Sequence, residues 1–417
     1  MSLISSLFTG VTGLAANAQA MEIIGDNISN VNTVGFKSSK AVFSDIFSTI
    51  LTNGSTTSQL GRGSQLQGTI KQFTQGSFES SSNALDLAID GSGFFVVSPT
   101  NTTGTFFTRA GQFRLNQNGL VQAITGEILQ GQQITNDTVS TSVSDIDLAG
   151  VQSTPQATTT FTLGANLDAS ATTSAATTFT SPITIFNSVG NQVTLSAQFT
   201  KVANANQWTY AISTSEGTVT SGASGSVTFD TSGQLSLVRG AAVADQSIVI
   251  NFSSASTPAA TQTLSWDLAN AAGTGTNGKL TGFAAESNNN SLVQDGFTTG
   301  TLTGLAVSDK GVIAGLFNNG QTDDLFQVTL ADFLAPSGLT RQGSNLFSES
   351  EESGQGVLGL ARTGGFGAIV GQSLELSNVD LAEQFITMIQ TQQAFQASSR
   401  IITTIDDLLT ESVNLVR

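Results

Sequence analysis

The sequence predicts a multidomain chain whose N- and C-terminal α-helices pair in a coiled-coil-like manner, with discontinuous all-β domains between them. Three observations support this fold class. Apolar residues recur in steps of three and four near both ends of the chain. Strand-like alternation and turn dipeptides fill the middle. Proline, which breaks helices, is confined to the central part, where its five copies are Pro99, Pro155, Pro182, Pro258 and Pro336.

The N-terminal segment, residues 1–36, predicts an amphipathic helix. Gly10, Gly13 and Gly25 interrupt it, and each weakens an isolated helix by about 1 kcal/mol relative to alanine. We therefore expect this helix to need a packing partner. Its apolar stripe occupies the a and d positions of a heptad and consists of Leu7, Val11, Leu14, Ala18, Met21 and Ile28.

The C-terminal segment, residues 378–417, predicts that partner. Ser377 or Asn378 is expected to cap a helix that continues to Val416 and is roughly 57 Å long. The alternative is an ordinary two-helix core element, but Gln392 and Ser399 at seam positions favour a partly polar tube of several helices. The heptad positions hold Leu381, Phe385, Met388, Phe395, Ile402, Leu409 and Val413, and the apolar face is widened by Ile386, Ile389, Ile401, Ile405 and Leu408.

The middle of the chain is predicted to be β-structure. Alternation or apolar runs mark Ile89–Val97, Pro182–Thr200 and Trp208–Ser213 as strands. Hairpins are expected at four turn dipeptides, Asn118-Gly119, Ser232-Gly233, Lys310-Gly311 and Asn319-Gly320.

Two segments rich in small residues, Thr154–Ala176 and Ala269–Asn277, are interpreted as linkers that bracket an inserted outer β domain at residues 158–284. The other segments then form an inner β domain (residues 85–157 with 285–365), a connecting segment (residues 37–84 with 366–377) and a terminal helical domain (residues 1–36 with 378–417).

The amino-acid composition excludes several classes of partner and of functional site. The formal net charge of −16 disfavours nucleic acid and anionic membranes as partners. With no cysteine and no histidine, disulfides, zinc–thiolate sites and imidazole chemistry are excluded. Charged residues make up only 11%, which suits contacts between copies of the chain. No apolar run reaches the ~18 residues of a membrane span, and the first residues do not resemble a cleaved secretory signal.

Motifs for chemistry are weak, and we expect no enzyme activity, cofactor or metal. Gly354 to Gly359 matches the dinucleotide pattern GxGxxG, but an acidic run precedes it and no amphipathic helix follows. The side chains of the adjacent pairs Asp323-Asp324 and Asp406-Asp407 diverge on a strand or a helix. A hydrolase with two carboxylates from distant parts of the chain remains open.

The most specific motif runs from Asp26 to Lys37, DNISNVNTVGFK. By residue type it is a helix exit, with asparagines that hydrogen-bond backbone groups, a glycine that permits an unusual backbone and a phenylalanine that anchors the next segment. It closely resembles the signature of the rod and hook axial proteins of the bacterial flagellum. The residues that carry the motif are Asn27, Asn30, Asn32, Gly35 and Phe36.

The resemblance extends along the chain. Gly91–Val97 and Phe107–Phe113 resemble the β core of this family, and Ser377–Phe395 resembles its C-terminal helix, with Phe395 where a tyrosine is common. The insertion beginning near Ile183 is similar to that of the hook members, which are longer than the rod members.

The resemblance implies a structural subunit of the flagellar hook, a helical homopolymer forming a hollow, flexible tube that passes torque to the filament as a universal joint. It further implies export by the type III apparatus and contacts with the distal rod, the hook cap and the hook–filament junction proteins. A distal rod subunit, a secreted β-rich adhesin and a carboxylate hydrolase are the competing interpretations.

Overall fold

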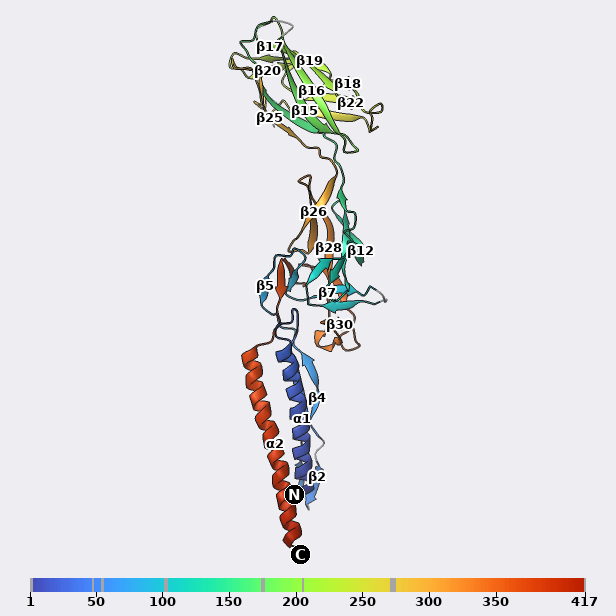
Figure 1. The fold of residues 1–417 in the computed structure, drawn as a ribbon, viewed down its shortest axis with the longest axis vertical. Coiled ribbons are helices and arrows are strands. Elements are labelled where there is room, and N and C mark those ends of the chain that lie inside the picture. Colours follow the sequence, from blue (N-terminus) through green and yellow to red (C-terminus); the bar gives the residue numbers. More distant parts are fainter. Residues whose placement is uncertain are drawn as a thin grey trace. The chain divides into compact units, whose positions relative to one another are not determined.

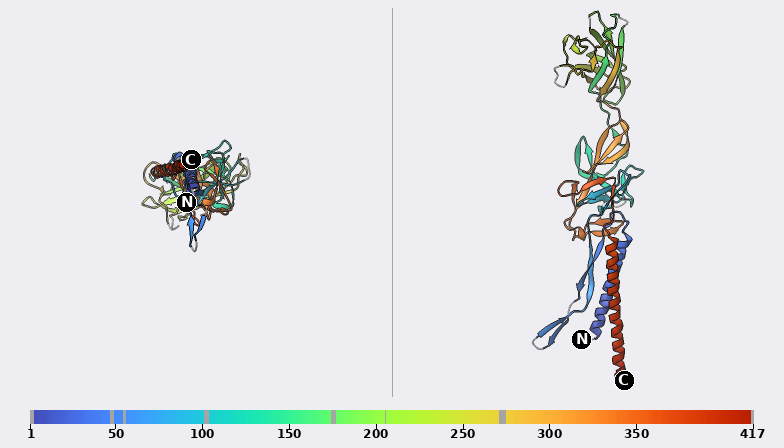
Figure 2. Two further views of the ribbon diagram at one scale, coloured as in Figure 1. Left: turned by 90° about the horizontal axis from the view of Figure 1, so that it is seen from below. Right: turned by 90° about the vertical axis from the view of Figure 1, so that its left-hand side faces the viewer.

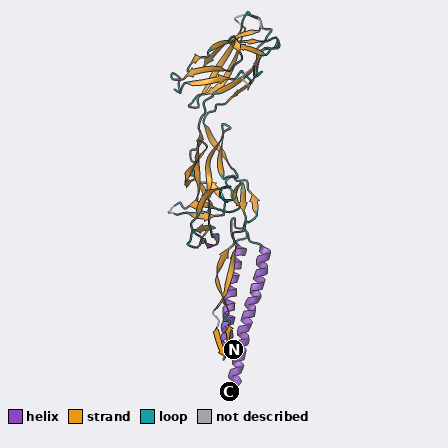
Figure 3. Ribbon diagram, turned by 180° about the vertical axis from the view of Figure 1, so that it is seen from behind, coloured by secondary structure: helices purple, strands orange, loops and turns teal. Residues whose placement is uncertain are grey.

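The computed structural model describes residues 3–46, 49–53, 56–100, 104–173, 177–204, 206–270 and 275–415. These residues form two compact units. Unit 1 comprises residues 1–150, 304–316 and 322–417, and unit 2 comprises residues 151–303 and 317–321. Helix is confined to two long terminal elements and one short 3₁₀ turn in the part described, and the remainder is strand and loop (Figure 3). The predicted fold class is confirmed.

The helices α1 (Leu3–Ser29) and α2 (Leu381–Leu415) lie side by side in unit 1 (Figure 1). Asp380 caps α2, because its Oδ1 accepts hydrogen bonds from the backbone N–H groups of Ala382 at 2.8 Å and Glu383 at 3.3 Å. The prediction that Ser377 or Asn378 caps this helix is therefore wrong. Val416 lies outside the described residues. None of the helices in the described part combines the length and the apolarity needed to cross a membrane.

An antiparallel ribbon follows α1 and lies along it (Figures 1 and 2). It pairs β1 (Ser39–Asp45) with β4 (Ser64–Lys71), and Ser39 stands opposite Lys71. A second hairpin, β2 (Thr49–Asn53) with β3 (Thr56–Leu60), is inserted between them. The segment interpreted as a connection thus contains β-structure that packs on the N-terminal helix.

The rest of unit 1 is all β and is called the β body. Its main sheet has the order β27-β28-β11-β7-β8-β30-β29, and two short pairs, β6 with β32 and β5 with β33, join its early and late segments. The early strands are β5 (Phe78–Ser80), β6 (Leu87–Asp90), β7 (Phe94–Ser98), β8 (Phe106–Thr108), β9 (Phe113–Leu115), β10 (Val121–Ala123), β11 (Ile128–Thr135) and β12 (Thr138–Asp145). The late elements are β27 (Val312–Phe317), β28 (Thr322–Asp332), η1 (Pro336–Gly338), β29 (Thr340–Gly343), β30 (Leu346–Ser348), β31 (Val357–Leu360), β32 (Ala368–Gly371) and β33 (Ser373–Glu375).

Two apolar clusters stabilise the β body. The larger is buried around Phe95, Leu129 and Leu330. The smaller is a group of edge-to-face phenylalanines; the Phe107 and Phe333 ring centroids, for example, are 4.8 Å apart. Both clusters combine strands from before and after the insertion, so the β body can form only when the two halves of the chain meet.

Unit 2 is a sandwich of two six-stranded sheets, β18-β22-β23-β14-β24 with β25 beside β14, and β15-β16-β17-β19-β20-β21. Aromatic side chains from both sheets fill the space between them, and the Tyr210 and Trp266 ring centroids are 5.3 Å apart. The strands are β13 (Gln152–Ser153), β14 (Thr160–Asn166), β15 (Thr178–Phe186), β16 (Gln192–Lys201), β17 (Gln207–Thr214), β18 (Thr218–Ser221), β19 (Ser224–Phe229), β20 (Leu235–Val238), β21 (Ala241–Ala242), β22 (Gln246–Asn251), β23 (Gln262–Trp266), β24 (Leu280–Thr281) and β25 (Asn288–Gln294), and β26 (Gly300–Val307) leads out of the unit.

Three details of the β prediction need correction. Ile89–Val97 is not one strand, because β6 ends at Asp90 and β7 begins at Phe94. Thr154–Ala176 is not a linker throughout, because it contains β14, in which Phe161 and Leu163 are buried in the core. Pro182–Thr200 is not one strand but most of a hairpin, with a turn in which Gly190 has a φ of 81°. Part of the second proposed linker, residues 271–274, lies outside the described residues.

The four predicted turn dipeptides are confirmed. Each lies between strands that are neighbours in a sheet, and the four glycines have φ angles from 74° to 81°.

Candidate assembly site: the terminal helices and their junction with the β body

Small residues on α1 allow α2 to approach closely. A Cβ atom at Gly10 would lie 3.0 Å from Ile402 Cγ1, and one at Gly13 would lie 3.0 Å from Ser398 Oγ. The buried face of α1 is completed by Ala16, Ala20 and Ile24, which are 3 to 6% exposed. Two of the three glycines that weaken α1 as an isolated helix, Gly10 and Gly13, are therefore also what lets the two helices pack.

The predicted stripe on α1 lies beside this face rather than on it. Val11 is 47% exposed, and the other members (Leu7, Leu14, Ala18, Met21 and Ile28) are half-buried. Large apolar side chains thus flank the contact of small residues inside one copy of the chain.

On α2, the predicted stripe is more exposed still. Only Thr391 and Ile405 are fully buried in the described part of α2. Met388, Phe395 and Ile402 are half-buried, and the residues left exposed are Leu381, Phe385, Ile386, Ile389, Ile401, Leu408, Leu409 and Val413. The helix therefore presents an apolar surface that α1 does not cover.

The motif at the end of α1 is a hydrogen-bonded exit. The amide of Asn27 is buried, accepts a bond from the backbone N–H of Ser39 at 2.9 Å and donates to Ser39 O at 2.8 Å and to Gln384 Oε1 at 3.1 Å. It thereby ties α1 to the ribbon and to α2. Asn30 Nδ2 donates to Asp26 O at 2.8 Å, whereas Asn32 is exposed.

Gly35 and Phe36 dock this exit on the β body. Gly35 has a φ of 69°, and a Cβ atom there would lie 2.5 Å from the backbone nitrogen of Ala110, so only glycine fits. Phe36 is 2% exposed, and the Arg341 guanidinium lies 5.4 Å from its ring centroid.

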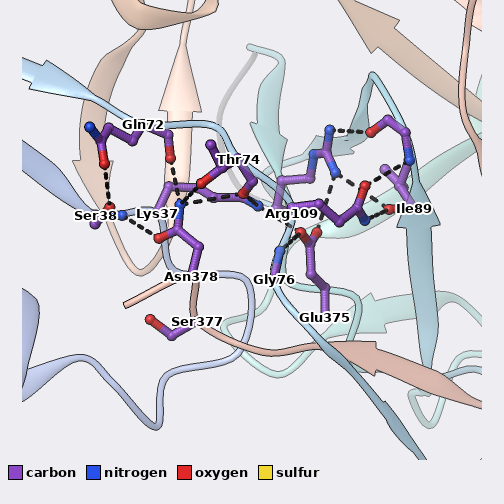
Figure 4. Close-up of polar contacts among 12 residues, drawn as sticks. Lys37, Ser38, Gln72, Thr74, Gly76, Ile89, Arg109, Glu375, Ser377 and Asn378 are labelled. Atoms are coloured by element: carbon purple, nitrogen blue, oxygen red, sulfur yellow. Dashed lines mark hydrogen bonds and ion pairs between the residues drawn. The ribbon is translucent and has the colours of Figure 1, made fainter. Parts of the chain in front are cut away.

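The next residue, Lys37, belongs to a buried cluster of charges with Arg109 and Glu375 (Figure 4). Glu375 Oε1 accepts from Lys37 Nζ at 2.6 Å and Oε2 accepts from Arg109 Nη1 at 3.3 Å. The three side chains are at most 5% exposed. The cluster joins the start of the ribbon, the segment after β8 and the end of β33.

Burial disfavours the charged forms of Lys37 and Arg109, and the Glu375 carboxylate opposes this effect. Burial lowers the pKa of Lys37 below the ordinary lysine value, and the Glu375 carboxylate opposes that shift. Burial likewise lowers the pKa of Arg109, again opposed by Glu375. Carbonyl groups add to these contacts, since Lys37 Nζ donates to Thr74 O at 2.7 Å and Arg109 Nη2 to Gly91 O at 2.8 Å. One carboxylate thus serves two buried cations.

Asn378 closes the other side of the junction (Figure 4). Its Oδ1 accepts from the backbone N–H of Ser38 at 2.7 Å, and its Nδ2 donates to Gln72 O at 2.7 Å and to Thr74 Oγ1 at 2.8 Å. The residue expected to cap α2 therefore fastens the start of α2 to the ribbon.

Sequence reasoning did not single out Lys37, Arg109 or Glu375 as site residues. Their sequence neighbours carry no common signal, because Ser38 follows Lys37 and Thr108 precedes Arg109, and only Glu375 lies between two leucines. Charged side chains are mostly exposed, and those that are fully buried are paired.

The weak chemical motifs do not form a site. Gly354 lies in a loop with a φ of 73°, and the edge strand β31, not a helix, follows it. Among the described residues, no group of three or more acidic side chains is placed to hold a metal ion.

Family models match four stretches of the chain. They are described as the flagellar basal body rod protein (residues 7–37), the flagellar hook protein FlgE/F/G D1 domain (residues 88–153), the flagellar basal body protein FlaE D2 domain (residues 156–297) and the flagellar basal body rod FlgEFG protein C-terminal (residues 370–415). Together they match most of both helices, the early part of the β body and most of unit 2.

Relatives match over nearly the whole length. The flagellar hook protein FlgE of Borreliella burgdorferi is 31% identical, covering 99% of this chain and 100% of the relative. That of Escherichia coli K12 is 30% identical, covering 97% and 98%. A crystal structure of Helicobacter pylori FlgE2 has 13% identity and a TM-score of 0.43 over 71% of this chain and 100% of that one, a likeness too distant to bear on function.

These matches include the central insertion, which a rod subunit is expected to lack, and they connect the chain with a structural protein of the flagellum. The chain belongs to the flagellar hook protein family.

Proposed function

We propose that this chain is the repeating subunit of a flagellar hook: it polymerises into a hollow, flexible tube that transmits motor torque to the filament as a universal joint. The observation that carries the proposal is the apolar surface of α2 that the chain itself leaves uncovered. Contiguous apolar surface of this kind marks an interaction site in a soluble protein.

The energetics favour assembly through the helices. Burying an exposed leucine, isoleucine, phenylalanine or valine contributes about 1.5–3 kcal/mol each. On α2 the side chains of Phe385, Ile386, Ile389, Leu408 and Val413 are 49 to 66% exposed in the single chain. Helices from neighbouring copies that cover this surface would stabilise both themselves and the polymer.

The proposed assembly interface comprises both predicted stripes. Its members on α1 flank the small-residue contact, so they are free to meet a neighbouring copy while that contact holds the pair together. The interface consists of Leu7, Val11, Leu14, Met21, Ile28, Leu381, Phe385, Met388, Phe395, Ile402 and Leu409.

The junction supports the proposed transmission of torque. Buried ion pairs from Glu375 to Lys37 and Arg109 hold the exit of α1 on the β body, and Asn378 holds the start of α2 on the ribbon. Such a connection resists rotation of the helices against the β body. Bending, by contrast, needs surfaces that slide, and a surface with few charges provides few ion pairs to oppose sliding.

We further propose how the chain is exported and which flagellar proteins the polymer contacts. The chain leaves the cell through the flagellar type III export apparatus. It adds to the distal rod under a hook cap, and the hook–filament junction proteins follow it. We propose no catalytic role, no nucleic-acid partner and no insertion into a membrane.

A gene deletion in the source bacterium tests the function. Cells without the chain should retain basal bodies that end at the rod, with neither hook nor filament, and the restored gene should return both. Antibodies against unit 2 should then label only the segment between rod and filament. Normal hooks in the deletion strain, or label on the rod alone, would contradict the proposal.

A further inference from the structure

A groove of about 380 Å³ lies on unit 2, where the strands β14, β24 and β25 meet. Its volume falls within the range of about 300–1,000 Å³ that small-molecule sites occupy. Leu163 and Ala165 of β14 are buried in the core, so Gly164 and Asn166, which alternate with them, line the groove on the opposite face of the sheet. We call it the amide groove; besides Gly164, its lining includes Asn166, Lys279, Phe283, Asn288, Asn290 and Ser291.

A β-bulge in β25 forms one wall of the amide groove. Gly164 stands opposite Ser291 and Ala165 stands opposite Asn289, so Asn290 is the extra residue of the bulge. Consecutive residues of a regular strand point to opposite faces, whereas Asn290 and Ser291 both line the groove. Gly164 leaves room for this wall, since a Cβ atom there would collide with Ser291 Oγ.

Asn166 fixes the opposite side of the amide groove. This residue is only 6% exposed, and its amide is fully used by the chain itself. Its Oδ1 accepts from the backbone N–H of Phe283 at 2.9 Å and from Thr281 Oγ1 at 3.1 Å, and its Nδ2 donates to Ala285 O at 2.9 Å. The segment that carries Phe283 is therefore held in place before a ligand arrives, which lowers the entropic cost of binding.

The groups that remain free in the amide groove are amides and an aromatic ring. The side chains of Asn288 and Asn290 are exposed and have no hydrogen-bond partner among the described residues. Each amide offers two donors and one acceptor, which suits neighbouring hydroxyl groups. Phe283 is 47% exposed, and its ring is braced by Gly233, where a Cβ atom would lie 2.7 Å from Phe283 Cδ1. None of the described lining residues carries a carboxylate.

These groups match the two kinds of surface that a sugar presents. A pyranose ring gathers C–H groups on one face, which suits the apolar face of a phenylalanine, and hydroxyl groups around its rim, which suit amides. A purely apolar ligand would leave the amides without partners. Nucleobases also stack on aromatic rings, but the net charge of −16 disfavours nucleic acid. The same charge repels acidic polysaccharides.

We propose that the amide groove binds a neutral glycan. Phe283 contacts the apolar face of one pyranose ring, and the amides of Asn288 and Asn290 hydrogen-bond its hydroxyl groups. Lys279, the one charged residue in the described lining, adds a further donor. This adhesive activity goes beyond the proposed function, because the groove lies entirely within unit 2 and its test does not require polymerisation.

Affinity electrophoresis of the full chain, at concentrations at which it is monomeric, tests the inference. The native gels contain soluble starch, mannan, galactan, hydroxyethyl cellulose or polygalacturonate. We expect at least one neutral polysaccharide to retard the chain, and the dissociation constant to rise about tenfold or more in Phe283→Ala and in Asn288→Ala/Asn290→Ala. Phe283→Tyr, which keeps the ring, should bind within about threefold of the original. Unchanged migration in all five gels, or the strongest retardation by polygalacturonate, would overturn the inference.

The matched control is Asn289→Ala, on the same strand but outside the described lining of the groove. It should bind like the original chain, and an equal loss in Asn289→Ala and Asn288→Ala/Asn290→Ala would overturn the inference. Thermal melts check that unit 2 is folded in each variant. If Phe283→Ala does not fold, the double variant at the two exposed asparagines decides, and full binding by that folded variant would overturn the inference. None of these outcomes bears on tube formation, so the proposed function is tested separately.

Discussion

Glu375 Oε1 lies 2.6 Å from Lys37 Nζ, and neither side chain is exposed to solvent, although 338 residues separate them in the chain. The same carboxylate also binds Arg109. The pair connects the segment that leaves the N-terminal helix with the segment that enters the C-terminal one. The segments next to the two terminal helices therefore meet at one buried carboxylate.

Removing the negative charge of Glu375 should lower the free energy of unfolding of unit 1. Glu375→Ala leaves two buried cations without a counter-ion, and such a loss typically costs about 3–5 kcal/mol. Calorimetry of the full chain should show a lower melting temperature for unit 1. The matched control is Asp309→Ala, which breaks the exposed pair with Arg362, whose side chains are 57% and 55% exposed; such a pair contributes at most about 1 kcal/mol. Equal losses in the two variants would contradict a stabilising role for the junction.

The small residues of α1 should tolerate no enlargement where α2 touches them. At Gly10, where a Cβ already meets Ile402, Gly10→Leu should destabilise the helix pair by about 1–3 kcal/mol through overpacking. At Gly25 a Cβ would meet nothing within 4 Å, so Gly25→Ala should stabilise the helix by about 1 kcal/mol. Thermal melts followed by helical circular dichroism measure both effects. If both substitutions shifted the melting temperature equally and in the same direction, Gly10 would not be needed for packing against α2.

The apolar stripes are predicted to act in assembly more than in the fold of the single chain. Leu14→Asp and Met388→Asp should each abolish tube formation and leave the β body and unit 2 folded, because a charge cannot be buried between helices without a partner. Val189→Asp, at an apolar residue of unit 2 that is 52% exposed, is the control and should assemble. Sedimentation and calorimetry separate assembly from folding, and normal tubes from either helix variant would refute the assignment of the stripes.

Unit 2 should lose stability in acid through Asp295. Burial alone would raise the pKa of Asp295, but hydrogen bonds from Thr159 and Thr160 outweigh it and lower that pKa. The stabilisation is therefore fully present above the unfolded value of ~3.9 and is lost as the pH falls through the lower folded value. Asp295→Asn should be less stable than the original at pH 7 and nearly equal to it below that window. Asp295→Asn should make the free energy of unfolding depend less on pH, whereas the exposed control Glu286→Gln should not. An equal pH dependence in the two variants would contradict this role.

Much of this architecture could be predicted from local signals. The heptad patterns predicted both terminal helices, and dipeptides such as Asn319-Gly320 predicted the hairpins. Both are possible because helix periodicity and turn chemistry depend on short stretches of sequence. The cap of α2 and the strand β14 were misassigned. Asn378 has the chemistry of a cap but is used by the ribbon, and the small residues around Phe161 resemble a linker.

The junction could not be predicted, because it depends on contacts between distant segments. The pairings of β6 with β32 and of β5 with β33 bring Lys37, Arg109 and Glu375 together from distant parts of the chain. The face of α1 that packs on α2 was likewise missed, because periodicity marks the large apolar residues, while close helix packing selects Gly10, Ala16 and Ala20.

The central claim is that the chain polymerises through its terminal helices. The most direct measurement is negative-stain electron microscopy of the concentrated, seeded full chain beside a chain lacking residues 1–36 and 378–417, with the truncated chain first shown to be folded by calorimetry. We predict hollow tubes from the full chain and none from the truncated chain. Tubes from a folded truncated chain, or no assembly from either, would contradict the account.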